Sequence, residues 1–227
     1  MTEEKKIVIA IDGPAGAGKS TIASRLARKL GYVNLESGAM YRALALKAIE
    51  NDISFDEEDP LLALAEKSRI TLEPRLDGNR VLLDRRDVSD RIREPDVTVG
   101  ASRVSVHPKV RAWMVARQQE MGISGGVVME GRDIGTKVFP NAEVKIFLEA
   151  DHDVRVERRV QQRGAPAGDK PNIAAELLDR DHRDTTRAAS PLVAAPDAVI
   201  LDSTHLSIDD VVARAEELVN KALGNLR

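Results

Sequence analysis

Short apolar runs alternate with amphipathic segments along most of the chain. Each run is apolar on both faces and is separated from the next by a helical pattern, which is typical of strands in a buried parallel sheet. The pattern predicts strands over residues 7–12, 32–35, 127–130, 144–150 and 198–202. Strands that alternate with helices in this way predict an α/β fold with the sheet at its centre.

The segments between the runs carry helical periodicity. In the first of them Ile22, Leu26 and Leu30 recur every four residues, and Gly31 supplies a C-terminal stop. Ser207 and Asp210, three residues apart, predict the start of the last helix. The further helices are expected over residues 38–51, 57–68, 95–104, 108–121, 152–163, 172–187 and 207–222.

One stretch breaks this alternation. Residues 69–83 hold two segments, RITLEP and RVLL, on either side of Asp77-Gly78-Asn79, and this pattern predicts an antiparallel hairpin. Because such a hairpin lies outside the alternation of strands and helices, we expect it to form a small lobe inserted into a single domain.

Composition narrows the possible partners. The net charge is −3 and only 3% of residues are aromatic, so the chain lacks the positive field and the stacking rings of a nucleic-acid surface. The absence of cysteine excludes disulfides and thiolate metal sites. The opening residues, MTEEKK, are too polar for a signal peptide, and no run approaches the roughly 20 apolar residues of a membrane span. We therefore expect a cytoplasmic protein that binds neither nucleic acid nor membrane.

The stretch GPAGAGKST lies between the first predicted strand and the first predicted helix. Its spacing is G-x-x-x-x-G-K-[ST], the motif of a phosphate-binding loop. Glycines let backbone N–H groups approach phosphate oxygens, the helix N-terminus favours negative charge, and the lysine adds a full positive charge. The serine hydroxyl is suited to Mg²⁺. The residues expected to contact ATP here are Gly13, Pro14, Ala15, Gly16, Ala17, Gly18, Lys19, Ser20 and Thr21.

The motif does not say where the terminal phosphate goes. No aspartate is followed by glycine three residues later, which excludes the switch of a regulatory GTPase. Glu130 and Asp202 each end an apolar run, and either carboxylate could orient a water on the metal. An ATPase therefore stays open on these residues alone.

A group of arginines around the loop GAPAGDKP favours transfer to an acceptor. Arg180, Arg183 and Arg187 share one helical face, with Asp184 beside them, and guanidinium groups on such a face suit phosphoryl groups. The alternative is a solvated helix with surface ion pairs. A helical hairpin with a glycine-rich tip can also close over phosphates and exclude water, which favours transfer over hydrolysis.

The segment GRDIGT, residues 131–136, directly follows a predicted strand. The carboxyl ends of parallel strands face the ligand crevice, so Arg132 and Asp133 are expected near the phosphate loop. Asp133 can accept a hydrogen bond from an exocyclic amine, and Arg132 can hold a phosphate. A turn stabilised by the aspartate is the alternative interpretation.

Five blocks, in order along nearly the whole chain, resemble the bacterial cytidylate kinase family. They are GPAGAGKST (13–21), SGAMYR (37–42), ASRVSVHPKVR (101–111), EGRDIGTKVFP (130–140) and RDHRDTTRAASPL (180–192). The resemblance implies the nucleoside monophosphate kinase fold, a P-loop NTPase-type three-layer fold with a five-stranded parallel sheet. It also implies one kinase domain over 1–227, with a monophosphate-binding lobe at 38–108, a small antiparallel sheet insertion near 69–90, and a helical lid at 155–187.

The resemblance also implies residue roles. Ser37 and Arg42 would lie in the acceptor site, and Arg180 and Asp184 would meet the sugar. The cytosine base would be read by Ser102, Arg111 and Asp133, and the acceptor phosphate would be held by Arg42, Arg132 and Arg187. The lid would bring Arg155 and Arg159 to the ATP phosphates. The catalytic residues would be Lys19, Arg132, Arg159 and Arg187. The metal would be held by Ser20 directly and by Glu130 through a water. The lid tip, GAPAGDKPNI, departs most from the family pattern.

The implied reaction is Mg²⁺-dependent transfer of the γ-phosphoryl group of ATP to CMP, and also to dCMP, in pyrimidine metabolism. The acceptor is itself a phosphate with a second pKa of about 6, so it is mostly dianionic at neutral pH and needs no general base. Catalysis is expected to come from alignment and from charge stabilisation by Lys19, Mg²⁺ and the arginines. A monomer is expected. Two alternatives stay open: the same fold acting on AMP or UMP, and an ATP-dependent conformational switch with a protein partner.

Overall fold

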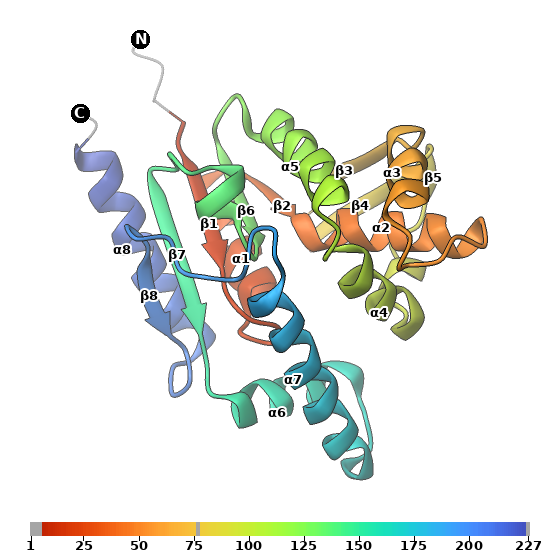
Figure 1. The fold of residues 1–227 in the computed structure, drawn as a ribbon. Coiled ribbons are helices and arrows are strands. Elements are labelled where there is room, and N and C mark those ends of the chain that lie inside the picture. Colours follow the sequence, from red (N-terminus) through yellow and green to blue (C-terminus); the bar gives the residue numbers. More distant parts are fainter. Residues whose placement is uncertain (1–5, 76–77, 226–227) are drawn as a thin grey trace.

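A five-stranded parallel sheet forms the centre of the computed structural model, which describes residues 6–75 and 78–225 (Figure 1). The strand order is β2-β6-β1-β7-β8, and every neighbouring pair is parallel. All five predicted strands are confirmed to within one residue at each end. They are β1 (Val8–Asp12), β2 (Val33–Glu36), β6 (Val127–Gly131), β7 (Val144–Glu149) and β8 (Val199–Asp202).

Helices cover both faces of this sheet. Ile9 and Ile11 of β1 face one apolar cluster, which contains Ile22 and Leu26, whereas Ala10 faces the other cluster. The alternation follows from the two-residue repeat of a strand. The helices on the first face are α1 (Lys19–Leu30) and α8 (Ile208–Asn225), and those on the second are α2 (Ser37–Glu50) and α5 (Pro108–Gly122).

The predicted caps of two helices are confirmed. Gly31 ends α1 in the left-handed conformation, and its N–H donates to Ala27 and Arg28. Ser207 and Asp210 form a capping pair, since the Asp210 N–H donates to Ser207 Oγ and the serine hydroxyl donates to the Asp210 carboxylate. Within residues 6–75 and 78–225, no helix is both long enough and apolar enough to cross a membrane.

The expectation that every strand is buried on both faces is wrong for β8. Val199 and Ile200 are 42% and 56% exposed. The reason is the position of β8 at the edge of the sheet, beside β7 only, where side chains meet fewer neighbours. The apolar run correctly predicts a strand but does not report whether the strand is central.

The predicted hairpin is confirmed and belongs to a three-stranded antiparallel sheet. Its strands are β3 (Ile70–Arg75), β4 (Gly78–Leu83) and β5 (Arg86–Asp87). Gly78 and Asn79 pair with β3 and so belong to β4 rather than to the turn, while Asp77 lies outside the described residues. Asn79 is buried, accepts a hydrogen bond from the Glu36 N–H and donates to the Asn34 carbonyl. The small sheet is therefore tied to the end of β2.

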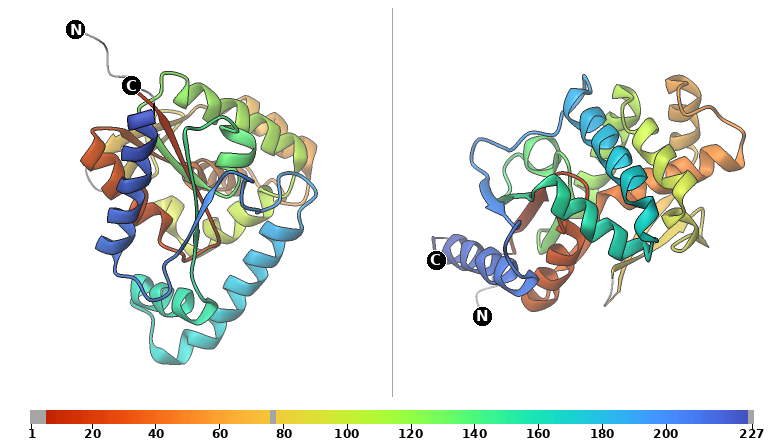
Figure 2. Two further views of the ribbon diagram at one scale, coloured as in Figure 1. Left: turned by 90° about the vertical axis from the view of Figure 1, so that its left-hand side faces the viewer. Right: turned by 90° about the horizontal axis from the view of Figure 1, so that it is seen from below.

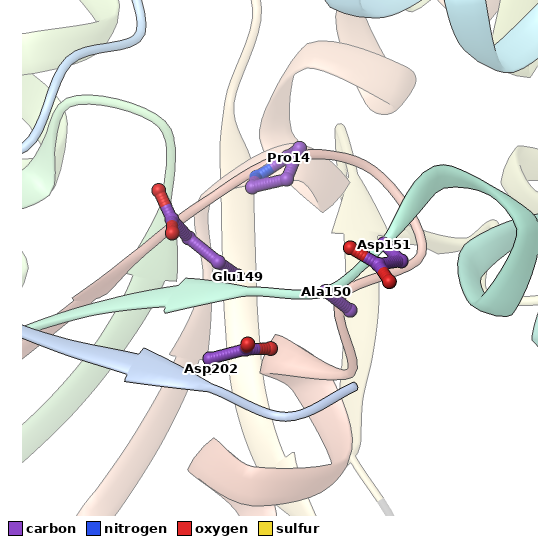
Figure 3. Close-up of a pocket in the computed structure, with 5 residues that line it drawn as sticks. All are labelled: Pro14, Glu149, Ala150, Asp151 and Asp202. Carbon is purple, nitrogen blue, oxygen red and sulfur yellow. The ribbon is translucent and has the colours of Figure 1, made fainter. Parts of the chain in front are cut away.

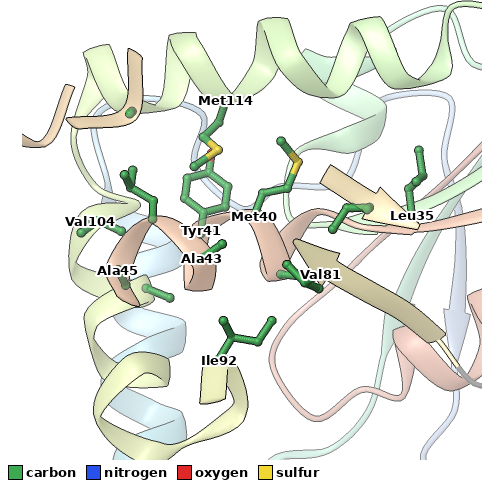
Figure 4. Close-up of a cluster of buried hydrophobic side chains, with 14 of the residues drawn as sticks. Leu35, Met40, Tyr41, Ala43, Ala45, Val81, Ile92, Val104 and Met114 are labelled. Atoms are coloured by element: carbon green, nitrogen blue, oxygen red, sulfur yellow. The ribbon is translucent and has the colours of Figure 1, made fainter. Parts of the chain in front are cut away.

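The helix α2 lies between α5 and this small sheet. Figure 4 shows Met114 of α5 over the ring of Tyr41 in α2, with Val81 of β4 and Ile92 on the other side. The cluster is completed by α3 (Glu58–Glu66) and α4 (Pro95–Val104), together with the 3₁₀ turn Arg91–Arg93.

A helical hairpin extends beyond the carboxyl ends of the strands (Figures 1 and 2). It consists of α6 (His152–Arg163) and α7 (Lys170–Thr186), joined through the 3₁₀ turn Ala167–Asp169. The second helix starts two residues before the predicted 172, because Pro171 is tolerated in a first helical turn. Val156, Ile173 and Leu177 of the hairpin pack against Ala15 of the loop after β1.

Candidate active site

The loop after β1 has a backbone that only glycine allows at key points. Gly13 has φ +147°, and a Cβ there would lie 2.1 Å from the Leu148 carbonyl oxygen. Gly16 has φ +78°, with a Cβ position only 3.1 Å from Arg155 Cβ. The loop ends at Gly18, the N-cap of α1, where no side chain caps the helix. The first-turn N–H groups of α1 therefore suit an anion.

Lys19 stands in the first turn of α1 and is 5% exposed. Its ammonium donates to the Pro14 carbonyl at 2.7 Å. Burial lowers the pKa of Lys19 to about 7; Arg132 and Arg180 act in the same direction and Glu130 acts against it. The positive charge of this lysine is therefore poorly compensated by the protein, and a bound anion would stabilise it.

Ser20 and Glu130 lie together, as the sequence predicted. The serine hydroxyl donates to Glu130 Oε1 at 3.0 Å, and burial raises the pKa of Glu130. Glu36 ends β2 in register with Glu130 of β6. Burial acts to raise the pKa of Glu36, but Arg42 beside it holds that pKa below its usual value. Two carboxylates with different environments thus face Lys19.

Cationic side chains from separate segments converge beside Lys19. Arg42 of α2, Arg132 after β6, and Arg159 of α6 all act on the charge of Arg180 in α7. Burial, followed by Arg132, lowers the pKa of Arg180 to about 10. Across residues 6–75 and 78–225, the buried arginine nitrogens that lack a hydrogen-bond partner are Arg42 Nε, Arg111 Nε, Arg180 Nε and Arg187 Nη2. Buried unpaired donors are costly, so these atoms are suited to anionic oxygens.

Two of the three side chains expected to read the base, those of Arg111 and Asp133, lie together. Arg111 is 3% exposed, donates to Asp133 Oδ2 at 2.5 Å and to the Ser105 carbonyl at 3.0 Å, and stacks 5.5 Å from the centre of the Tyr41 ring. Ser102 accepts a hydrogen bond from Arg183 Nε at 3.0 Å. Arg111 and Asp133 thus form a buried ion pair, and the Ser102 hydroxyl contacts an arginine of α7.

Asp184 joins the two arginines expected on the acceptor phosphate. Arg132 Nε donates to Asp184 Oδ2 at 2.7 Å, and Arg187 Nη1 donates to Asp184 Oδ1 at 3.4 Å. Burial acts to raise the pKa of Asp184, but Arg132, Arg180 and Arg187 hold it below its usual value. The carboxylate thus orients both guanidinium groups.

Two predicted residues make contacts that the sequence did not suggest. The Ser37 hydroxyl donates to the Glu130 carbonyl at 2.8 Å. Arg155 donates to the carbonyls of Ala15 and Ala150 and pairs with Asp181, which also accepts from the Ala15 N–H. These contacts favour a structural role for Arg155, in which it ties the loop to the hairpin, over the expected contact with the ATP phosphates. Arg159, on the same helix as Arg155, lies among the cations around Arg180.

Sequence reasoning missed three carboxylates at this site, Asp12, Glu36 and Asp181. The signal for the first two was available, since each ends a strand as Glu130 does. The strand containing Glu36 was expected to end at 35, which left the residue in the helix region. No local pattern identifies Asp181, because its partners lie on another helix and on the loop.

A separate pocket of about 200 Å³ lies at the ends of β7 and β8 (Figure 3). It is lined by Pro14, Glu149, Ala150, Asp151 and Asp202. Three carboxylates make this pocket unsuited to phosphate. Asp202 accepts from both the N–H and the hydroxyl of Thr204. Of the two carboxylates considered for the metal-bound water, Glu130 is therefore the one that reaches Ser20.

The chain has close relatives among known proteins. The family model for cytidylate kinase matches residues 9–221. A cytidylate kinase from Enterococcus faecalis (strain ATCC 700802 / V583) is 49% identical over 219 residues, covering 95% of this chain and 96% of its own. Another, from Solibacter usitatus (strain Ellin6076), is 48% identical over 230 residues, covering 100% of this chain and 97% of its own.

A solved structure extends the likeness to the fold. A crystal structure of an uncharacterized protein from Eubacterium ventriosum ATCC 27560 has a TM-score of 0.53 at 14% identity, covering 96% of this chain and 99% of that one. At that identity the likeness concerns the fold alone.

Proposed function

The chain belongs to the cytidylate kinase family, and from that membership we propose that it moves the γ-phosphoryl group of ATP to CMP or dCMP, giving CDP or dCDP and ADP. The observation that carries this proposal is the convergence of Lys19, at the phosphate loop, with buried arginines that have unpaired donors. Two phosphate groups facing each other would supply the missing negative charge.

The donor phosphates would bind at the loop 13–21. The loop has positive φ at Gly13, Gly16 and Gly18, a backbone shape that other residues rarely adopt, and the uncapped N–H groups of α1 begin at its end. Lys19 would turn from the Pro14 carbonyl to the phosphates, regaining full charge. Arg159 of α6 would approach these phosphates from the helical hairpin.

The acceptor would bind on the other side of Lys19. We assign its phosphate to Arg42, Arg132 and Arg187. Arg42 and Arg187 each have a buried nitrogen without a hydrogen-bond partner, and the buried Asp184 carboxylate orients Arg132 and Arg187. Cytosine presents an amine donor beside two acceptors, and Asp133, Arg111 and Ser102 offer the complementary groups. The sugar would then lie beside Arg180 and Asp184.

Transfer needs no general base. A phosphate oxygen of CMP attacks the γ-phosphorus, and the bond from that phosphorus to the bridging oxygen of ADP breaks as the new bond forms. Lys19 and the arginines hold the two reactants in line and stabilise charge on the moving group. We propose that residues 38–108 act as the monophosphate-binding lobe and residues 155–187 as a lid that excludes water.

Mg²⁺ fits this arrangement. Ser20 and Glu130 offer a hydroxyl and a buried carboxylate 3.0 Å apart. Burial raises the pKa of Glu130, and a nearby cation would act against that rise. No cluster of three His, Cys, Asp or Glu ligands occurs in the described part of the chain, which agrees with an ion held mainly by phosphates and waters. We assign Ser20 as a ligand and Glu130 as the partner of a metal-bound water. The ion would neutralise charge on the transferring phosphates. A monomeric state and a cytoplasmic location stay predictions.

An assay of ADP release separates this function from its rivals. Purified protein with ATP and Mg²⁺ is given CMP, dCMP, UMP, AMP or no acceptor, and ADP is measured through a coupled reaction. We expect CMP and dCMP to stimulate release above the other acceptors. Lys19→Ala, prepared identically, reports any contaminating kinase. Faster ADP release with AMP or UMP than with CMP would mean that the natural acceptor is not CMP. Rapid ADP release without any acceptor would favour an ATPase.

A further inference from the structure

Asp12 is a buried carboxylate for which the reaction above has no use. It is the last residue of β1, directly before Gly13 of the phosphate loop, and it is 5% exposed. Its two oxygens accept hydrogen bonds from consecutive peptide groups of another segment. Oδ1 accepts from the Ile134 N–H at 2.8 Å, and Oδ2 accepts from the Gly135 N–H at 2.7 Å. The side chain thus joins the end of β1 to the turn after β6.

The charged groups around Asp12 do not neutralise it. Asp133 raises its pKa and Lys19 lowers it, but burial is the largest influence and brings the pKa to about 6. Lys145 of β7 also passes close by, since a Cβ at Gly135 would lie 3.4 Å from Asp12 Oδ2 and 3.3 Å from Lys145 Cδ. The ammonium of Lys145, however, pairs with Asp197 and the Pro140 carbonyl. The two peptide N–H groups are therefore the main partners of the Asp12 carboxylate.

Those two N–H groups belong to the turn that directly follows Arg132 and Asp133, the residues expected at the acceptor. Ile134–Val138 forms a single π-helical turn, and Asp12 satisfies its first two N–H groups from a different strand. Immediately before this turn stand Arg132, oriented by Asp184, and Asp133, paired with Arg111. Any shift of the peptides at 134 and 135 would rotate the backbone from which these side chains project.

We propose that Asp12 is a positioning residue that holds the acceptor-binding turn in register with the phosphate loop, so that Arg132 and Asp133 meet the acceptor while its phosphate faces the donor. We call the two hydrogen bonds from Ile134 and Gly135 to Asp12 the clamp. What the turn binds rests on the proposed function, whereas the existence of the clamp does not. One carboxylate next to the donor loop thereby sets the geometry of the acceptor site. The distance between the two binding sites is then fixed by β1 and β6, which pair directly, with Asp12 opposite Gly131.

The variant Asp12→Asn tests the clamp with little change of shape. An amide keeps one acceptor oxygen but turns an NH₂ group toward the second peptide N–H, which leaves that donor unpaired. We expect amide hydrogen exchange at Ile134 and Gly135 to speed up by about tenfold or more, the equivalent of one charge-assisted hydrogen bond. Exchange at Val128, inside β6, should not change. The matched control is Asp197→Asn, which removes a nearby carboxylate that also lies against Lys145 but does not touch the turn.

Kinetics then distinguish positioning from general destabilisation. Asp12→Asn should raise the KM for CMP by about tenfold and narrow the selectivity for CMP over UMP, while the KM for ATP stays within about threefold. Asp197→Asn should leave all three quantities near wild type. Unchanged exchange at Ile134 and Gly135 would overturn the proposal. So would faster exchange with unchanged KM and selectivity for CMP, or equal loss for CMP and ATP.

The wild-type protein provides a second test if the variant does not fold. An opening that breaks only the two hydrogen bonds leaves the Asp12 carboxylate buried but removes the peptide donors that lower its pKa, so the proton favours the open form. Protection factors of the Ile134 and Gly135 amides, corrected for intrinsic exchange, should therefore fall as pH drops through about 6, where Asp12 gains a proton. Those of β6 amides should stay level. Level protection at Ile134 and Gly135 would contradict the clamp. The exchange measurement requires no nucleotide, so its result holds even if the acceptor is not CMP. In that case the wild-type ADP-release assay would show no preference for CMP, while the exchange result would be unaffected.

Discussion

Binding of ATP to the phosphate loop is expected to add a proton to Lys19. In the ligand-free protein the lysine is buried, and its pKa is lowered from 10.5 to about 7 by that burial and by Arg132 and Arg180. Phosphate oxygens would provide the opposite charge that the protein lacks. An opposite charge within a few ångströms favours the charged form, so the pKa should return toward its usual value.

The size of the effect follows from the two pKa values. At pH 8, about one lysine in ten is charged when the pKa is about 7, and nearly all are charged when it is near 10.5. Each bound ATP should therefore take up about 0.9 proton. Arg180, with a pKa of about 10, is already charged at pH 8 and contributes little. Asp12, with a pKa of about 6, is already ionised.

Isothermal titration calorimetry measures this proton directly. ATP is titrated into the protein at pH 8 in HEPES and in Tris, which differ in ionisation enthalpy, and the difference in heat gives the protons exchanged. EDTA is present so that metal binding does not contribute to the proton count. Phosphate buffer is avoided because it would compete for the loop. Lys19→Met is the matched variant, with a side chain of similar length and no charge.

The reasoning fails if wild-type uptake is below about 0.2 proton per ATP, since Lys19 would then already be charged in the free protein. It also fails if Lys19→Met takes up as much as wild type, because another group would be the source. An uptake near one proton that disappears in the variant supports both the burial of Lys19 and its contact with phosphate.

Three further predictions concern other parts of the molecule. Glu130→Gln should raise the Mg²⁺ concentration for half-maximal activity by about tenfold, as measured by metal titration; an unchanged requirement would remove Glu130 from the metal's surroundings. Asp133→Asn should raise the KM for CMP by about tenfold without a matching change in the KM for ATP, as measured by steady-state kinetics with each substrate varied. Equal changes in both KM values would mean that Asp133 has no part in base recognition. Gly100→Ala should lower the free energy of unfolding by about 1–3 kcal/mol in urea, because its Cβ would lie 2.5 Å from the Phe55 ring, whereas Gly224→Ala, with open space around it, should raise that free energy by up to about 1 kcal/mol.

The sequence was sufficient for the sheet and the long helices, and it pointed to several residues that the structure brings together, such as Ser20 with Glu130 and Arg111 with Asp133. Strands such as residues 127–130 are short apolar runs bounded by turns, and α1 carries both a four-residue apolar repeat and a glycine stop. The pattern of apolar positions predicts these features because each is determined by residues that are close together in the sequence. β5 was missed because two residues, Arg86 and Asp87, are too short to show any alternation.

Contacts between distant segments were not predictable in this way. Asp12 meets Ile134 and Gly135, and Arg155 meets Ala15, because of strand register and helix packing that no local pattern encodes. The exposure of Ile200 depends on which strand lies at the sheet edge. The motifs predict which residues bind the phosphates, whereas the tertiary structure was needed to find the carboxylates that pair with them.

The central claim is that ATP and CMP lie with their phosphates facing each other in one cleft from which water is excluded. Phosphorus NMR of a reaction mixture with wild-type protein, ATP, CMP and Mg²⁺ follows the terminal phosphate itself. The account predicts that the γ-phosphate signal of ATP is replaced, one for one, by the β-phosphate signal of CDP, with little inorganic phosphate. Inorganic phosphate as the main product, at a rate that CMP does not change, would contradict it.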